Sequence, residues 1–314
     1  MATSTMISVA LALALVLVGS WFFASSLWAR LLLAIARRWA GLNSRFVTVG
    51  GTRWHYLEGG RGPLLVALHG FGGDADNWLR AAPRLTKHFR VLFPDLPGFG
   101  DSSPGPDASY EIPAQTRRLR AFLEAVGEEP EFLAGNSMGG WVACDYAMNF
   151  PDQLKALWLL APLGVKDAPL SPVLKAIETG DVSPLDISSA DQFRHRVVQP
   201  MFGRLPIIPT PMMAYYARRG IANSERAQVQ FSQVLASPLS LEDIMVRLSL
   251  PVQLQWGTLD RAVNPEGAKA VRSVKPDIEI HLLEAIGHLP MLESPRDSVE
   301  RWVAFCRQRG LLSH

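Results

Sequence analysis

The most informative segment of the chain is residues 131–147, Glu-Phe-Leu-Ala-Gly-Asn-Ser-Met-Gly-Gly-Trp-Val-Ala-Cys-Asp-Tyr-Ala. The apolar run at 132–134 predicts a buried strand, and apolar side chains at helical spacing after Gly140 predict a helix. Between them, residues 135–139 match the pattern G-x-S-x-G. A sharp strand-to-helix turn requires such glycines because it leaves no room for Cβ atoms. The segment therefore predicts that Ser137 is a nucleophile held at the head of a helix.

Outward from this segment, short apolar runs alternate with helical patterns along the chain. The runs lie at residues 64–68, 91–93, 132–134, 157–160, 252–255 and 278–283. Runs this short and continuous suit strands that are buried on both faces of a parallel sheet. Ahead of them, Gly50 and Gly51 separate two further apolar segments and predict a hairpin. The predicted fold class is therefore α/β, with a mostly parallel, doubly wound sheet.

A serine hydroxyl needs a base to take its proton, and His288 is the predicted base. His288 lies in a loop directly after the last predicted strand, whereas His281 lies inside that strand and is predicted to be core. Asp260 follows the strand at 252–255 and is predicted to orient the imidazole of His288. Both loops then lie at the carboxyl ends of neighbouring strands, where doubly wound folds place their sites. The chain order Ser, Asp, His supports this assignment.

Residues 69–73, His-Gly-Phe-Gly-Gly, follow the strand at 64–68. Glycines let backbone amides approach a ligand closely, so this loop is predicted to stabilise an oxyanion. The predicted donors are the backbone N–H groups of Phe71 and Met138. His69 is predicted to order the loop rather than to act as a base. Asp95, which ends another strand before Ser137, is predicted to bond loop amides.

Composition sets limits on the function. The 314 residues are 48% hydrophobic, and 31 Lys and Arg against 29 Asp and Glu leave a formal charge of +2. This near-neutral balance excludes a strongly basic nucleic-acid binder. Two cysteines, Cys144 and Cys306, exclude a disulfide-dense scaffold and a Cys-rich metal site. Ser294 and Pro295 predict the start of the last helix, with Cys306 on its buried face.

The N-terminus predicts a membrane anchor. Residues 6–29 carry no charged side chain, and as a helix they would extend about 36 Å, enough to cross a hydrocarbon core about 30 Å thick. The helix is predicted to continue past Arg30 with an amphipathic end at the lipid headgroups. A cleaved signal peptide and a buried core helix are the alternatives. Arginines follow the run at Arg30, Arg37, Arg38 and Arg45, and by the positive-inside rule they place the rest of the chain in the cytoplasm.

These motifs together resemble the α/β-hydrolase superfamily over about residues 44–314. The anchor, the elbow at Ser137 and the segment from Trp256 to Asp260 look like membrane-anchored monoacylglycerol lipases and, equally, a bacterial membrane-anchored phospholipase A. The resemblance implies an α/β-hydrolase fold plus an N-terminal transmembrane helix in the bacterial inner membrane. It also implies a catalytic domain on the periplasmic side, against the positive-inside rule. The arginines after the run are then expected to bind anionic headgroups.

The resemblance also implies a cap inserted into the core. The expected division is residues 1–40 for the anchor and juxtamembrane helix, 41–164 for the first part of the core, 165–239 for the cap and 240–314 for the second part of the core. The cap holds a stretch rich in Pro, Met and aromatic residues, and flexible Met suits varied apolar chains. The residues expected to line an acyl pocket are Met212, Met213, Tyr215 and Tyr216. Ordinary cap core is the alternative.

The sequence thus predicts a serine ester hydrolase that acts on membrane lipids through an acyl-enzyme, with no metal or organic cofactor. Its expected partners are a lipid or fatty-acyl substrate and the membrane, with self-association of the anchor into a homodimer as a further option. A carbon–carbon bond hydrolase of ring-cleavage products and a general carboxylesterase are alternatives. A membrane receptor or scaffold without turnover is a third class, although such proteins typically lose a triad member. Ser137 argues against haloalkane dehalogenases and epoxide hydrolases, which carry Asp at the elbow.

Overall fold

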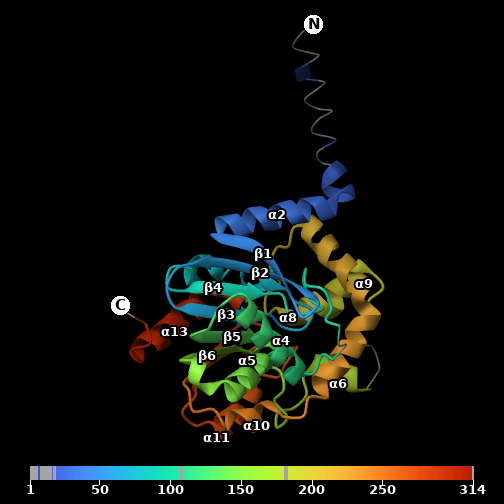
Figure 1. The fold of residues 1–314 in the computed structure, drawn as a ribbon. Coiled ribbons are helices and arrows are strands. Elements are labelled where there is room, and N and C mark those ends of the chain that lie inside the picture. Colours follow the sequence, from blue (N-terminus) through green and yellow to red (C-terminus); the bar gives the residue numbers. More distant parts are fainter. Residues whose placement is uncertain (1–5, 8–15, 17–18, 107–108, 180–182, 313–314) are drawn as a thin grey trace.

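The computed structural model describes residues 6–7, 16, 19–106, 109–179 and 183–312. The main body of the molecule is one sheet between two layers of helices (Figure 1). The described strands are β1 (Leu42–Val49), β2 (Thr52–Gly60), β3 (Leu64–Leu68), β4 (Arg90–Pro94), β5 (Phe132–Asn136), β6 (Ala156–Leu160), β7 (Val252–Gly257) and β8 (Glu279–Leu283). Their order is β1-β2-β4-β3-β5-β6-β7-β8. The β1–β2 and β2–β4 pairs are antiparallel, and the other neighbouring pairs are parallel. The predicted α/β class with a mostly parallel sheet is confirmed.

The central strands are apolar on both faces because both faces are covered. In β3, Val66 and Leu68 pack on one side of the sheet while Leu65 and Ala67 pack on the other. The first side is covered by α4 (Ile112–Ala125), α5 (Met138–Asn149), α10 (Leu241–Met245) and α11 (Gly267–Val274). The second side is covered by η1 (Ala75–Trp78), α3 (Ala82–Leu85), α12 (Pro290–Glu293) and α13 (Pro295–Gln308). A short 3₁₀ helix, η2 (Pro151–Gln153), leads from α5 into β6.

Two local predictions needed correction. Helix α13 begins at Pro295 as predicted, and Cys306 is buried, but the side chain of Ser294 makes no capping hydrogen bond. The Ser294 carbonyl accepts from the Ser298 amide instead, at 3.0 Å. His281 is only half-buried and contacts Glu279, because β8 is the last strand of the sheet and borders solvent.

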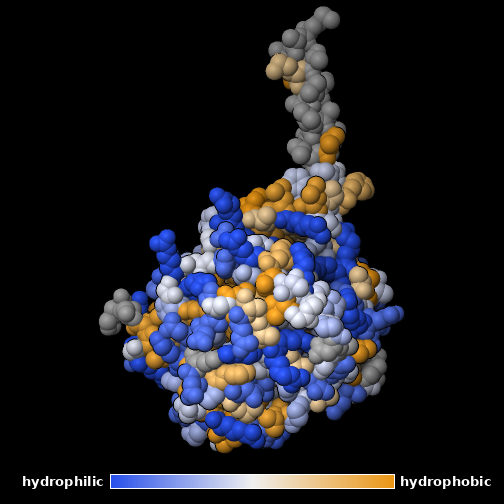
Figure 2. All heavy atoms as spheres, in the orientation of Figure 1, coloured by the Kyte–Doolittle hydropathy of each residue, from blue (hydrophilic) through white to orange (hydrophobic). Residues whose placement is uncertain are grey.

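The N-terminal helix α2 (Ser25–Trp39) lies across one end of the molecule, against β1 and the start of α9 (Figure 1). Its inner side buries Ala29 and Leu33 against Tyr215. Its outer side leaves Leu27 and Ile35 exposed, at 69% and 57% of their surface, and Figure 2 shows apolar atoms gathered there. Helix α2 begins after a turn at Ala24, so it does not continue the preceding segment without a break.

Within the described residues, no helix combines the length and the apolar character needed to span a bilayer. The predicted anchor at 6–29 falls partly outside that part of the chain, because residues 8–15 and 17–18 are not described.

The expected cap at 165–239 contains short helices and one long one. The elements are α6 (Pro172–Thr179), α7 (Ala190–Gln192), the π-helix η3 (Phe193–Val198), α8 (Gln199–Met201) and α9 (Thr210–Leu235). Helix α9 runs along the side of the molecule from α2 down to α6 (Figure 1). It reaches from α2 to the elbow side of the core, where Phe231 is buried. The division into four segments stays a prediction.

Candidate active site

Ser137 lies at the turn between β5 and α5 with a strained backbone. Its φ of 54° and ψ of −121° are rare for a residue with a Cβ, and such strain persists only where the surroundings enforce it. A Cβ at Gly135 would lie 2.2 Å from the Gly139 carbonyl oxygen, and a Cβ at Gly139 would lie 2.5 Å from the His69 carbonyl oxygen. These positions accept only glycine, so the sequence pattern and the sharp turn have one steric cause.

The glycine loop after β3 packs directly against this turn. A Cβ at Gly70 would lie 3.1 Å from the Ser137 Cβ, which places the loop beside the hydroxyl-bearing residue. Among the described residues, no protein acceptor takes a hydrogen bond from the amide of Phe71 or Met138. The Met138 amide also belongs to the first turn of α5, where N–H groups have no intrahelical partner. Gly70 lies next to Ser137, and the amides of Phe71 and Met138 directly follow Gly70 and Ser137 in the chain, so both stay the predicted donors to an oxyanion.

His288 and Asp260 form a buried pair. The Nδ1 of His288 lies 2.7 Å from Oδ2 of Asp260, and both side chains are almost fully buried. Asp260 is fixed in turn by the amides of Ala262 and Val263, which donate to Oδ1 at 2.8 and 3.0 Å, and by Trp256 Nε1, which donates to Oδ2 at 3.0 Å. With Nδ1–H donating to the carboxylate, Nε2 of His288 carries the lone pair that a general base needs.

The loop of His288 is joined to the elbow through the residue before Ser137. Asn136 Nδ2 donates to the carbonyl oxygen of His288 and to that of Leu160, both at 3.0 Å. Within the described residues, Ser137 Oγ and His288 are not hydrogen-bonded to each other. The structure therefore brings Asp260 to His288 and the His288 backbone to the elbow, while the contact between hydroxyl and imidazole stays a prediction. In free enzymes this contact is often long.

His69 and Asp95 hold the loops around the elbow, as predicted. The Nδ1 of His69 donates to the Gly70 carbonyl at 2.7 Å and its Nε2 accepts from the Leu96 amide at 3.0 Å. Burial lowers the pKa of His69, so the ring stays neutral and both nitrogens are occupied. It has no nitrogen left to serve as a base.

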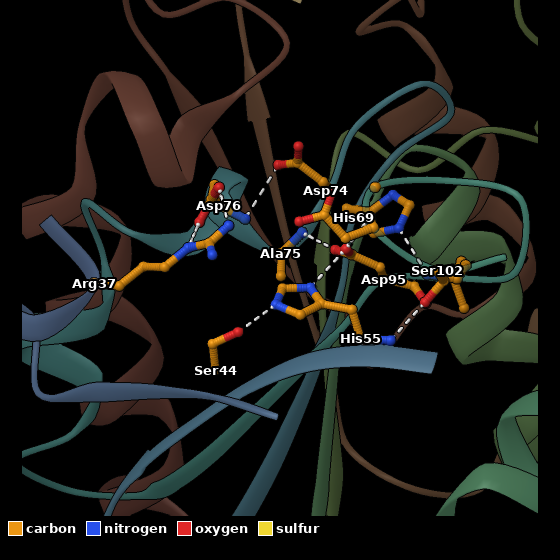
Figure 3. A network of polar contacts seen from close by, with 12 residues as sticks. Arg37, Ser44, His55, His69, Asp74, Ala75, Asp76, Asp95 and Ser102 are labelled. Atoms are coloured by element: carbon orange, nitrogen blue, oxygen red, sulfur yellow. Dashed lines mark hydrogen bonds and ion pairs between the residues drawn. The ribbon is translucent and has the colours of Figure 1, made fainter. Parts of the chain in front are cut away.

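The carboxylate of Asp95 accepts hydrogen bonds from the amide of Ala75 at 2.6 Å and from the amide of Asp101 at 2.7 Å. A further partner, His55, was not predicted. Its Nδ1 donates to Asp95 at 2.7 Å and its Nε2 lies 2.8 Å from Ser44 Oγ (Figure 3). Burial works against the charge on Asp95, but the hydrogen bond and attraction from His55 outweigh it and lower the pKa of Asp95.

Glu293 is another residue that the sequence did not reveal. Its carboxylate accepts from the Gly287 amide at 3.0 Å and from the Gly203 amide at 2.9 Å. The His288 amide donates to the Met201 carbonyl at 2.8 Å. Glu293 thus ties the loop that carries His288 to residues 201–203 of the expected cap. A Glu in a short helix after the base gives no signal of this role, because its partners are backbone groups far along the chain.

The four residues expected to line an acyl pocket lie on the first turns of α9. Tyr215 packs against Ala29 and Leu33 of α2, and Met212 and Tyr216 pack against the same cluster. Their role in binding an acyl chain stays a prediction. Nearer the elbow, the ring of Phe71 contacts Phe231 of α9 and Phe99, with centroids 4.8 and 5.3 Å apart.

The two cysteines are buried and unbridged. Burial raises the pKa of Cys144, and it raises the pKa of Cys306 to about 12. Neither thiol is therefore ionised near neutral pH, and neither competes with Ser137 as a nucleophile.

Comparison with known proteins now settles the family. Residues 63–295 match the model of the α/β-hydrolase fold. The chain belongs to the α/β-hydrolase family. This hydrolase is 30% identical over 259 residues to Lipase 1 of Psychrobacter immobilis, covering 81% of each chain. It is 28% identical to a monoacylglycerol lipase of Xenopus laevis, covering 86% of this chain and 83% of that one.

Solved structures agree. The hydrolase is similar to a membrane phospholipase A with a TM-score of 0.87 and 33% identity, over 98% of each chain. A serine hydrolase involved in carbazole degradation, with a TM-score of 0.70 and 22% identity, shares the fold alone. Together these relatives identify the chain as an ester hydrolase of the lipase and phospholipase type.

Proposed function

We propose that the chain is a membrane-anchored serine ester hydrolase that cleaves carboxylic esters of membrane lipids. His288 takes the proton of Ser137, whose oxygen attacks the acyl carbonyl. The oxyanion accepts hydrogen bonds from the amides of Phe71 and Met138. His288 then protonates the departing alcohol, and water releases the acyl group from Ser137 by the reverse sequence. Asp260 holds the imidazole in one tautomer throughout.

One observation carries this proposal. A strained serine at a strand-to-helix turn packs against the glycine loop after β3, and the residue before it is bonded to the loop of a histidine whose Nδ1 is 2.7 Å from a buried carboxylate. Each part has a simpler structural explanation by itself, but their convergence at the carboxyl ends of β3, β5, β7 and β8 is what acyl transfer requires.

The lipid substrate and the membrane location rest on other support. The relatives named above are a lipase, a monoacylglycerol lipase and a membrane phospholipase A. Residues 6–29 form the uncharged run that we propose as an anchor in the inner membrane, with the catalytic part on the periplasmic side. A tethered enzyme meets lipid at a high effective concentration. Self-association of the anchors into a homodimer is part of the same proposal.

The test compares the purified full chain with its Ser137→Ala variant. Both are assayed for release of fatty acid from a monoacylglycerol, a lysophospholipid and a phospholipid in mixed micelles. We expect turnover of at least one lipid by the wild type and a loss of at least about 10⁴-fold in the variant. Activity retained in the variant would contradict the assignment of Ser137 as the nucleophile. Turnover of a ring-cleavage diketone without any lipid hydrolysis contradicts the substrate class.

A further inference from the structure

A cavity of about 400 Å³ opens beside α2, away from Ser137. Its walls come from α2, β1, β2, α9 and the loop after β4, and they include Arg30, Arg37, Arg53, Phe46, Asp101 and Tyr215. The volume falls in the range of small-molecule sites. The cavity includes Tyr215, one of the four residues expected to line an acyl pocket, but its lining contains none of Ser137, Asp260, His288, Phe71 and Met138.

The charge of the cavity wall is positive. Arg37 is bound to Asp76 through two hydrogen bonds of 2.7 Å (Figure 3), and Asp101 lies 3.4 Å from Arg219. These two carboxylates are therefore already matched. Arg30 and Arg53 have no carboxylate partner among the described residues. Two guanidinium groups with unused N–H donors then face one cavity, and guanidinium geometry matches phosphate oxygens well.

Arg53 is held in place without being neutralised. Its guanidinium carbon lies 3.6 Å from the centre of the Phe46 ring, a cation–π contact that orients the group and leaves its edge donors free. Leu33 and the ring of Tyr215, both buried, also line the cavity and give it an apolar side. A cationic rim over an apolar wall suits a ligand that has both an anionic head and an apolar body.

The surroundings indicate where such a ligand comes from. On the outer side of α2, Leu27, Leu31, Ile35 and Trp39 recur every four residues and are all exposed, Trp39 by 81%. An exposed apolar stripe of this kind is unfavourable in water but stable in the headgroup and acyl boundary of a bilayer. With the stripe in that layer, Arg30 on the same helix lies at the depth of lipid phosphates.

We propose that this cavity is a second lipid site, which binds the phosphate headgroup of an anionic phospholipid through Arg30 and Arg53. The inference rests on the membrane part of the proposed function and is independent of the catalytic serine. It assigns the cavity to lipid that is bound and not hydrolysed there. A free phosphate ion offers the same oxygens, and the experiment separates the two sources.

The test measures binding to the full chain in non-ionic micelles by calorimetric titration. Every protein carries Ser137→Ala, so the probe is not consumed. The probes are dihexanoyl phosphatidylglycerol, dihexanoyl phosphatidylcholine and inorganic phosphate. We expect the anionic lipid to bind about tenfold more tightly than the other two. Arg30→Gln and Arg53→Gln should each weaken that binding about tenfold, because each removes a charged hydrogen-bond donor.

Arg38→Gln is the matched control. It removes one charge from the same helix, but Arg38 does not line the cavity, so we expect less than a twofold change. An equal loss in Arg38→Gln would show a general effect of surface charge and overturn the site. No loss in Arg30→Gln and Arg53→Gln would also overturn it, since lipid held at the elbow alone is insensitive to both. Inorganic phosphate binding as tightly as the lipid would reassign the cavity to a free ion.

Phe46→Ala gives a second check that leaves every charge in place. It removes the ring beneath Arg53, so the guanidinium loses its fixed position, and we expect the anionic lipid to bind about threefold more weakly. Unfolding midpoints measured in the same micelles should agree across all variants, since these side chains are exposed. If Phe46→Ala leaves lipid binding unchanged but Arg53→Gln weakens it, the site is still supported. If neither variant weakens lipid binding, the site is contradicted.

Discussion

Two histidine–carboxylate pairs in this molecule look alike. In the elbow pair, His288 and Asp260, and in the loop pair, His55 and Asp95, the Nδ1 to Oδ2 distance is 2.7 Å. Each carboxylate also accepts two backbone amides, and all four side chains are buried. The loop pair even has a serine on its far nitrogen, because Ser44 Oγ lies 2.8 Å from Nε2 of His55.

The two pairs differ in what surrounds the serine. Ser44 lies in β1, paired in regular antiparallel register with Leu57 of β2, and no helix begins beside it. Ser137 has a positive φ, begins a helix and stands against the glycine loop. We therefore expect a hydrogen-bonded Ser-His-Asp chain to be insufficient by itself to make a serine a nucleophile. Free amides that can receive developing negative charge are what separate the elbow pair from the loop pair.

Covalent labelling is the most direct test of the difference in reactivity between Ser137 and Ser44. We expect a fluorophosphonate probe to modify Ser137 completely and to leave Ser44 unmodified, because only Ser137 has amides to stabilise the phosphonyl oxygen. Peptide mass spectrometry of the labelled chain measures both sites at once. Labelling of Ser44 in the Ser137→Ala variant would show that the loop pair also activates its serine.

The next largest effect concerns the bases. His288→Gln should lower ester hydrolysis by about 10⁴-fold, because the base acts in the transition state. The matched variant His55→Gln should retain hydrolysis within about tenfold. Steady-state assays with a short nitrophenyl ester compare them. Similar losses of activity in both would mean that the loop pair takes part in turnover.

Stability should depend on the loop pair even though turnover does not. His55→Ala leaves the buried carboxylate of Asp95 without one of its partners, so we expect a loss of about 3 kcal/mol. The unfolding midpoint should then fall by roughly 2–4 °C for each kcal/mol lost. Thermal unfolding of wild type and variant in the same detergent measures the difference. A midpoint unchanged by His55→Ala would contradict the structural role of the loop pair.

The smallest expected effect is a pH dependence beside the loop pair. Burial raises the pKa of Asp74 well above its ordinary value, and repulsion from Asp76 and Asp95 adds to the rise. The folded state therefore binds a proton that the unfolded state has released, and the stability from this group falls as pH rises from Asp74's ordinary pKa to its raised folded pKa.

Asp74→Asn keeps an acceptor for the Asp76 amide, which donates to Asp74 at 3.2 Å, but removes the charge. It should raise the free energy of unfolding at neutral pH by on the order of 1 kcal/mol and flatten the slope with pH. The lowered pKa of Asp95 has the opposite sign, so its stabilisation disappears only in acid, as pH falls through that lowered value. Chemical denaturation across this range separates the two groups.

The sequence predicted the sheet because its central strands are buried on both faces and so appear as short apolar runs, as β3 and β6 do. It predicted the elbow because a sharp turn restricts Gly135 and Gly139 by sterics alone. It did not reveal His55 or Glu293, since their partners are chosen by tertiary proximity. The sequence also did not show which side of α2 is buried. The helix has two apolar sides, and packing against Tyr215 of α9 determines which of them faces the core.

The Glu293 carboxylate has a consequence for access to the site. It accepts hydrogen bonds from the amides of both Gly203 and Gly287, and these two residues are so close that a Cβ at Gly287 would lie 2.4 Å from the Gly203 nitrogen. Residues 201–203 are thus tied to the loop of His288, so that displacing them would pull this loop away from Asp260. We therefore expect a long acyl chain to enter at a distance from residues 201–203, where its passage leaves the contact between His288 and Asp260 undisturbed.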